Sequence, residues 1–162
     1  MDQYSRLKET PFHSENVYCI CDVPVLVLGM MVSYLPNPIR CMNCLELVNP
    51  SEIPVPISEV FVLSDWALSL ASINWLAFNE SSYENWADSE RTNFHSKLNE
   101  VGLGIHGKLN ESSKIYYWYS RNMNDVTENC PICKKKMTKT KYKYSSALQC
   151  EDCLIAAAPY AG

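Results

Sequence analysis

Four cysteines near the C-terminal end of the chain have the spacing of a zinc site. Cys130-Pro131-Ile132-Cys133 and Cys150-Glu151-Asp152-Cys153 form two C-x-x-C pairs, separated by 16 residues. Two thiolates three residues apart around a tight turn occupy two corners of a tetrahedron, and a hairpin between the pairs brings up the other two corners. The spacing predicts a structural zinc site whose ligands are Cys130, Cys133, Cys150 and Cys153.

The other four cysteines allow more than one interpretation. Cys41-Met42-Asn43-Cys44 is a further pair, and Cys19 and Cys21 lie on one side of an expected strand, so these four could bind a second zinc ion. Alternatively, Cys19 and Cys21 are small buried hydrophobes and the Cys41–Cys44 pair is empty. A redox role for that pair is disfavoured, because the proline-rich sequence that follows it offers no helix of a βαβ unit.

Candidate catalytic groups are few. His13, His95 and His106 are the three histidines of the chain, and none lies in a metalloprotease, P-loop, nucleophile-elbow or deaminase pattern. A zinc ion with four cysteine ligands has no open coordination position and cannot activate water. We therefore expect a protein that is not an enzyme.

Two helices are expected in the middle of the chain. Ser58 is a plausible N-cap for a helix over about 59–77, in which Leu63, Trp66, Leu70 and Ile73 recur at helical spacing. After a polar loop over 79–88, a second helix is predicted over about 89–109. Its apolar stripe consists of Phe94, Leu98, Val101, Ile105 and Leu109, although Gly102, Gly104 and Gly107 weaken it.

Strands are expected on both sides of these helices. The run over 17–35 predicts one or two buried strands broken near Pro24, with a common face made by Val17, Cys19, Cys21, Val23 and Val25. An aromatic segment over 114–120 predicts another strand. Residues 138–145 alternate as a further strand, with Lys139, Lys141 and Lys143 on one face.

Together these elements predict an α+β fold, a small mixed sheet with two main helices plus a C-terminal zinc ribbon. We expect a flexible N-terminus over 1–15, an α+β body over 16–127 and the ribbon over 128–162. The longest apolar run, 23–35, is shorter than the roughly 20 residues that span a bilayer, and the N-terminus has no signal-like segment. We expect a cytoplasmic protein, in which cysteines bind metal rather than form disulfides.

Charge is unevenly distributed along the chain. Residues 1–127 carry 8 basic and 15 acidic side chains, a balance of −7, whereas residues 128–162 carry 6 and 3, a balance of +3. An acidic body favours a basic protein partner over phosphate. The candidate contact residues combine charge with aromatic rings, which could instead close the core: Glu80, Tyr83, Glu84, Trp86, Asp88 and Glu90.

Several segments resemble a bacterial family of zinc-ribbon-containing proteins whose suggested function is nucleic-acid binding. The similar segments span roughly 35–155 and are Asn37-Pro38-Ile39-Arg40-Cys41-Met42-Asn43-Cys44, Ile53-Pro54, Leu98 with Gly102-Leu103-Gly104-Ile105, Tyr116-Tyr117-Trp118-Tyr119, and the two terminal cysteine pairs. The chain has Lys134 where that family tends to have glycine, and it lacks a basic residue between Cys150 and Cys153. These departures weaken the nucleic-acid implication more than the zinc implication.

Two functions follow as hypotheses. Small acidic proteins with exposed aromatic residues and few catalytic groups act in bacteria as immunity proteins or antitoxins, so by analogy we expect a protein that neutralises a cognate toxin by direct contact. The alternative is nucleic-acid binding through Lys139, Lys141 and Lys143, with neighbouring tyrosines stacking on bases. These lysines could instead protect an exposed strand from pairing.

Overall fold

The computed structural model describes residues 4–7, 18–30, 37–53, 55–79, 82–122 and 127–159. Within the segment expected to be flexible, residues 1–3 and 8–15 lie outside the described part. Residues Ser5–Leu7 form a short 3-10 helix, η1. Leu7 is 2% exposed and packs into the main core, which shows that this part of the N-terminus is anchored to the body.

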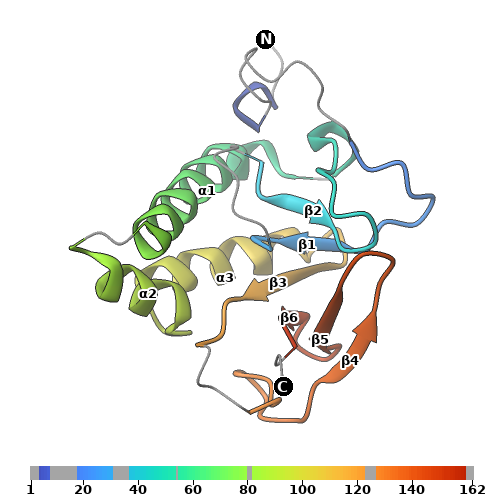
Figure 1. Ribbon diagram of the computed structural model, residues 1–162. Helices are drawn as coiled ribbons and strands as arrows, with labels where there is room; N and C mark the ends of the chain where they lie inside the picture. The colour runs from blue at the N-terminus through green and yellow to red at the C-terminus, as the bar shows by residue number, and fades with distance from the viewer. Residues whose placement is uncertain are drawn as a thin grey trace.

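In the described part of the chain, six strands form one mixed sheet in the order β2-β1-β3-β6-β5-β4 (Figure 1). The pairs β1–β3 and β3–β6 are parallel, and the other three pairs are antiparallel. The predicted α+β class with a mixed sheet is confirmed. The strands are β1 (Leu26–Leu28), β2 (Ile39–Cys41), β3 (Ile115–Tyr119), β4 (Thr138–Lys141), β5 (Ser146–Cys150) and β6 (Ile155–Ala157).

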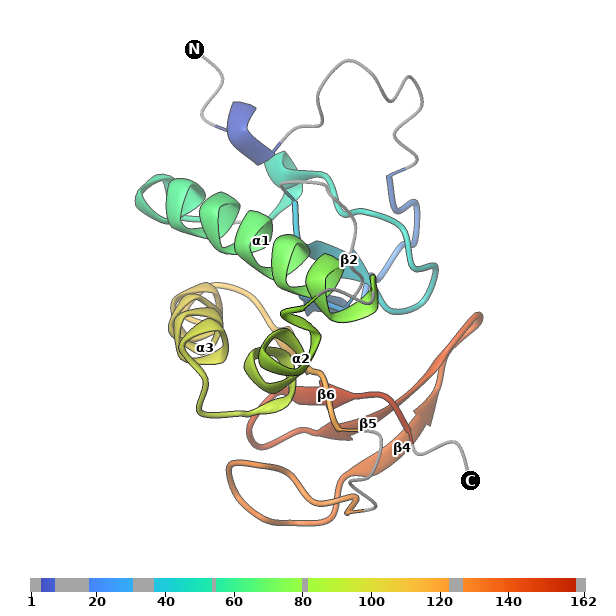
Figure 2. The same ribbon diagram turned by 60° about the vertical axis from the view of Figure 1, so that its left-hand side comes forward.

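The α-helices of the described residues lie on one side of this sheet (Figure 2): α1 (Ile57–Phe78), α2 (Glu84–Thr92) and α3 (Lys97–Leu109). A second 3-10 helix, η2 (Pro50–Glu52), precedes α1. The predicted helix over 59–77 is confirmed as α1. Its Leu63, Trp66, Ala67 and Ala71 are at most 4% exposed, so they supply the apolar face that packs on the sheet.

The prediction of one helix over 89–109 is wrong, because α2 and α3 are separate. Ser96 caps α3 by accepting a hydrogen bond from the Asn99 amide at 3.2 Å. The buried Asn99 side chain donates to the carbonyl oxygens of Glu90, Arg91 and Asn93, which fixes the turn between the helices. The predicted polar loop over 79–88 is also too long, since α2 begins at Glu84.

The strand expected over 17–35 is reduced to β1. Val23, a member of the predicted common face, is 79% exposed, so the described residues 18–25 do not form that face. Val17 lies outside the described part. Before β1, this segment instead makes a single bridge, between Tyr18 and Leu47, and carries Cys19 and Cys21. The prediction of a strand over the residues before β1 is wrong because Cys19 and Cys21 pack beside Cys41 and Cys44, and this packing sets the path of the chain there. Residues 31–36 lie outside the described part.

By length and composition alone, Ser58–Phe78 is apolar enough to cross a membrane, with a mean hydropathy of 1.4 over an 18-residue window. In the structure 44% of this window is buried, and the buried residues include the polar side chains of Ser64 and Asn74. One face of the helix packs into the core through Leu63, Trp66 and Ala67, and a core helix passes the same test of length and composition.

The C-terminal strands continue the body sheet. β6 lies between β3 and β5, and the Tyr117 amide donates to the carbonyl of Leu154 at 2.8 Å. The hairpin of β4 and β5 reaches back to the other end of the sheet, where the Ser145 hydroxyl donates to the Met42 carbonyl at 3.3 Å. The expected boundary between residues 127 and 128 therefore falls within one continuous sheet.

Candidate metal centres

The eight cysteines gather into two groups of four. In each group the four sulfur atoms lie within 4.8 Å of one another. We call Cys19, Cys21, Cys41 and Cys44 the N-terminal cluster, and Cys130, Cys133, Cys150 and Cys153 the C-terminal cluster. The predicted zinc site is thus confirmed as a group able to hold a metal ion. The second site, which the sequence left open, is equally able to hold one.

The sulfur separations fit zinc. A tetrahedral site with Zn–S bonds of about 2.3 Å has sulfur–sulfur edges of about 3.8 Å. The Sγ atoms of Cys133 and Cys150 are 3.5 Å apart. Four ionised thiols at this spacing would repel one another, so a divalent cation is the group that allows all of them to be thiolates.

All three C-x-x-C turns share one backbone feature. The residue after the second cysteine has a positive φ in each: 67° at Leu45, 62° at Lys134 and 50° at Leu154. The Leu45 amide donates to the Cys41 carbonyl at 2.7 Å, and the Lys134 amide donates to the Cys130 carbonyl at 3.0 Å. Residues other than glycine rarely adopt a positive φ. Its occurrence after the second cysteine of each pair indicates that the three turns hold their cysteines in a similar way.

Backbone amides favour the thiolate form of some of these cysteines. The amide of Lys135 donates to Cys133 and lowers the pKa of that thiol to about 7. Burial opposes ionisation at Cys41, but hydrogen bonds from the amides of Cys44 and Asn43 outweigh it, and the pKa of Cys41 is lowered. The Cys21 amide donates to the Cys19 sulfur at 3.4 Å. Amide-to-sulfur bonds of this kind suit the thiolates that zinc requires.

Other members of the clusters are held neutral when no cation compensates them. Burial raises the pKa of Cys19, and it raises the pKa of Cys153 to about 12. Zinc would supply the charge that deprotonates such thiols, and its uptake would release their protons. The donor sets therefore fit two structural zinc sites of the four-cysteine type.

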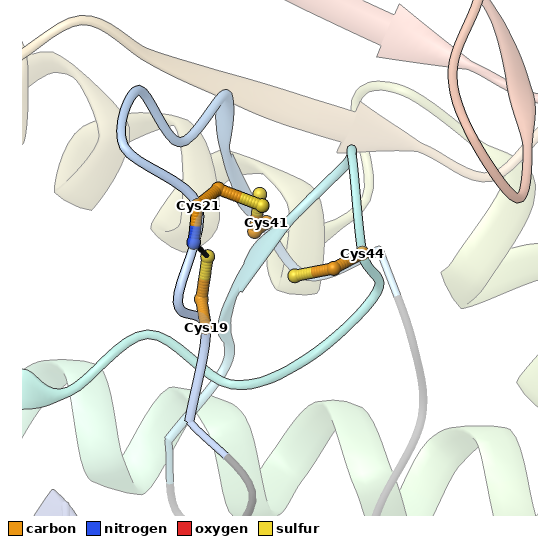
Figure 3. A group of neighbouring side chains, drawn as sticks. All are labelled: Cys19, Cys21, Cys41 and Cys44. Atoms are coloured by element: carbon orange, nitrogen blue, oxygen red, sulfur yellow. Dashed lines mark hydrogen bonds between the residues drawn. The ribbon is translucent and has the colours of Figure 1, made fainter.

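Figure 3 shows how the fold builds the N-terminal cluster, with four side chains pointing toward one another from two segments. Cys41 ends β2, and Cys44 follows in the turn. The loop that carries Cys19 and Cys21 is fixed by main-chain hydrogen bonds: the Cys19 amide donates to the Leu47 carbonyl at 2.7 Å, and the Met42 amide donates to the Val25 carbonyl at 2.8 Å. This cluster thus joins the loop before β1 to the end of β2.

The C-terminal cluster is surrounded by ion pairs that the sequence analysis missed. Glu151 and Asp152 lie between the last two cysteines, where the resembling family has a basic residue. Asp152 accepts from Lys135 at 2.5 Å, and Glu151 accepts from Lys114 at 2.7 Å and from the Tyr116 hydroxyl. Lysines distant in sequence therefore supply positive charge beside this turn, which no local motif could have revealed.

The predicted partner-binding residues lie mostly on the surface of α2. Tyr83 is 64% exposed and Trp86 is 52% exposed, so these rings do not close the core. Glu84 is exposed, Asp88 pairs with Arg91 at 2.7 Å, and Glu90 is half-buried. Glu80 lies outside the described residues.

Two further exposed aromatic residues, near the end of α1 that leads to α2, were not singled out in the sequence. Trp75 and Phe78, near the end of α1, are 47% and 65% exposed, and the Arg91 guanidinium lies 4.8 Å from the centre of the Phe78 ring. Both side chains lie outside the apolar stripe of α1 that faces the sheet. Large aromatic residues outside such a stripe are a sequence signal of an exposed apolar surface. We call Trp75, Phe78, Tyr83 and Trp86 the α1–α2 corner.

The three lysines of the alternative hypothesis lie on and beyond the edge strand β4. Lys139 and Lys141 are exposed on β4 itself. Lys143 is in the turn after β4, with its Nζ 4.9 Å from the centre of the Tyr144 ring. The prediction that all three lysines lie on one face of one strand is therefore wrong, because β4 ends at Lys141. Lysines at a sheet edge commonly prevent pairing with other chains.

Comparison with known proteins yields no assignment: the chain matches no protein-family model, no curated protein and no solved structure. The resemblance to zinc-ribbon-containing proteins stays a prediction.

Proposed function

We propose that this protein is a non-enzymatic, two-zinc protein that binds a protein partner through its α1–α2 corner. Its mode of action would be that of an immunity protein or antitoxin, which neutralises a cognate toxin by contact. The observation that carries the proposal is the exposure of four large aromatic side chains at one helix corner. Tryptophan, tyrosine and phenylalanine are enriched at protein interfaces, and tryptophan and tyrosine are enriched among the few residues that carry most of the binding energy.

Charge supports a basic partner. Residues 57–92 contain six acidic side chains and one basic side chain, a balance of −5. Carboxylates next to exposed rings speed association with a positively charged surface and disfavour nucleic acid. A cytoplasmic location is part of the proposal, because reduced cysteines can then bind zinc.

The histidines in the described part of the chain support a non-catalytic role. His106 is 8% exposed, and its Nε2 atom is 2.9 Å from the Ile115 carbonyl, a structural contact between α3 and β3. His95 is exposed in the turn between α2 and α3. His13 lies outside the described residues.

The proposal is tested by site-specific photo-crosslinking in cells of the native host. A benzoylphenylalanine residue is placed at Tyr83 or Trp86, and at Lys139 or Lys141 as matched controls on the edge strand. We expect a discrete protein adduct from the corner positions and a much weaker one from β4. Adducts at β4 alone would contradict the proposal.

Nucleic-acid binding is the outcome that would favour the alternative. We expect the purified zinc-loaded protein to show no tight binding to random RNA or DNA at physiological ionic strength. Tight binding with a steep salt dependence, lost when Lys139, Lys141 and Lys143 are all replaced by glutamine, would replace the protein-binding proposal.

A further inference from the structure

An apolar groove runs between α1 and α3, next to the α1–α2 corner. Its volume is about 420 Å³. Trp66, 4% exposed, forms its base, and the indole Nε1 donates to the Leu98 carbonyl at 2.9 Å, so the base is fixed. The walls are made by Val62, Ser69 and Ile73 of α1 and by Leu98 and Val101 of α3.

The groove has the lining of a helix-binding surface. A hydrophobic groove between two helices is the kind of surface that binds the apolar face of an amphipathic helix. Three charged residues also line it: Asp65 of α1, Glu90 of α2 and Lys97 of α3.

The charges around the groove indicate the sign of the charge on the helix that binds there. Among the described residues, the basic side chains near this face are paired: Arg6 with Asp65, Arg91 with Asp88, Lys97 with Glu100, and Lys108 with Glu59. Glu84 and Glu90 of α2 have no such ion pair within the described part, and Glu90 lines the groove. The excess charge on this face is negative.

We infer that the groove binds an amphipathic helix of the partner protein, with basic residues flanking its apolar face. This inference rests on the proposed function and specifies the form of the partner. A second copy of this chain fits less well, because each copy has a net charge of −4 and would bring its own unpaired carboxylates to the contact.

The test uses a fluorescein-labelled model peptide of 14 leucine and lysine residues that forms a basic amphipathic helix. Fluorescence anisotropy compares it with two controls: a scrambled peptide of the same composition, and a helical peptide with glutamate in place of lysine. We expect the basic helix to bind, the scrambled peptide to bind at least about tenfold more weakly, and the acidic helix not to bind. Equal binding of the first two peptides, or no binding, would overturn the inference.

A pair of variants locates the binding site. Ser69→Trp fills the groove, whereas Ser72→Trp makes the same change on an exposed position of α1 that does not line it. We expect Ser69→Trp to weaken binding of the basic helical peptide at least about tenfold. Ser72→Trp should change the affinity for this peptide by less than about twofold. Thermal unfolding of both variants shows whether each retains the fold. Equal effects of the two changes would contradict binding in the groove.

Crosslinking separates this inference from the proposed function. Benzoylphenylalanine at position 97, an exposed residue at the rim of the groove, should capture the same partner as positions 83 and 86. Capture at 83 and 86 with none at 97 would leave the proposed function standing and refute the groove. Capture at none of the three would refute both. A dimer in sedimentation velocity that Ser69→Trp dissociates would show that a second copy occupies the groove and would also refute the inference.

Discussion

Two glycines of α3 have opposite roles, although they lie only two residues apart. A Cβ atom at Gly102 would be 2.7 Å from Trp66 Cζ2 and 2.8 Å from Tyr117 Cε2, whereas a Cβ atom at Gly104 would have nothing within 4 Å. The missing side chain at Gly102 lets α3 approach both the indole and the β3 tyrosine. Gly104 only weakens the helix.

The first prediction follows from this difference. Gly102→Ala should lower the free energy of unfolding by about 1–3 kcal/mol, because the tightly packed rings must move. Gly104→Ala should raise it by up to about 1 kcal/mol, because alanine is the better helix former. Denaturant unfolding of both variants measures these changes. A destabilised Gly104→Ala protein would contradict this account of α3.

Lys134 supports a second prediction at the residue scale. It is a side chain at φ 62° in the first turn of the C-terminal cluster, where the left-handed conformation costs about 1–2 kcal/mol. Lys134→Gly should therefore stabilise the zinc-loaded protein by up to about 1 kcal/mol, after the greater chain entropy of glycine is subtracted. Lys139→Gly, within β4, is the matched control and should be destabilising. The inference about the turn fails if both changes destabilise the protein equally.

At the scale of elements, His106 links α3 to β3 and makes their packing sensitive to pH. Burial lowers the pKa of His106 below its usual 6.5, although hydrogen bonds to the carbonyls of Ile115 and Leu154 act in the opposite direction. The histidine is therefore neutral in the folded protein at a pH where it takes up a proton in the unfolded chain. The stability that it contributes is present above pH 6.5 and is lost as the pH falls below this value.

The third prediction is that His106→Gln removes part of the acid sensitivity. Between pH 7.5 and 5.5, with zinc in excess, the parent protein should lose more unfolding free energy than the variant, by at most about 1.4 kcal/mol for each pH unit below 6.5. His95→Gln, at an exposed position, is the control and should show the same pH dependence of unfolding free energy as the parent protein. Identical pH profiles for parent and His106→Gln would show that the buried histidine does not govern this dependence.

At the scale of the whole molecule, the two cysteine clusters lie beside β2 and β5, which are far apart in the strand order of one sheet. The β4–β5 hairpin begins beside the C-terminal cluster, and its turn contacts Met42, next to the N-terminal cluster. We predict that metal analysis finds two zinc ions per chain in the parent protein. Each of the variants Cys41→Ser and Cys130→Ser should contain one zinc ion per chain. One zinc ion in the parent protein that persists in Cys41→Ser would show that the N-terminal cluster binds none.

A fifth prediction concerns how far the loss of zinc spreads. Cys130→Ser should expose β4 and β5 to hydrogen exchange and should also loosen β3, because β6 lies between β3 and β5. α1 should retain most of its protection, because η1, α2 and α3 pack on it. Exchange confined to residues 128–158 would instead show that the ribbon is an independent domain.

The sequence by itself determined the features whose physical cause is local. The C-terminal cluster follows from two short pairs joined by a hairpin, and α1 and β3 follow from helical periodicity and from a dense run of aromatic residues. In each case, neighbours along the chain supply the geometry: a tight turn for two thiolates, one helix face, or one extended segment.

Only the tertiary structure decided the rest. Cys19 and Cys21 join Cys41 and Cys44 because the antiparallel pairing of β1 with β2 brings two loops together, and no spacing rule encodes that contact. The division of α2 from α3 depends on Asn99, whose amide binds three carbonyls of the turn while its oxygen accepts from Tyr117 at 2.6 Å. The groove likewise exists only because two helices meet over Trp66. Such features arise from contacts between distant segments, whose energies outweigh the local preferences that a sequence displays.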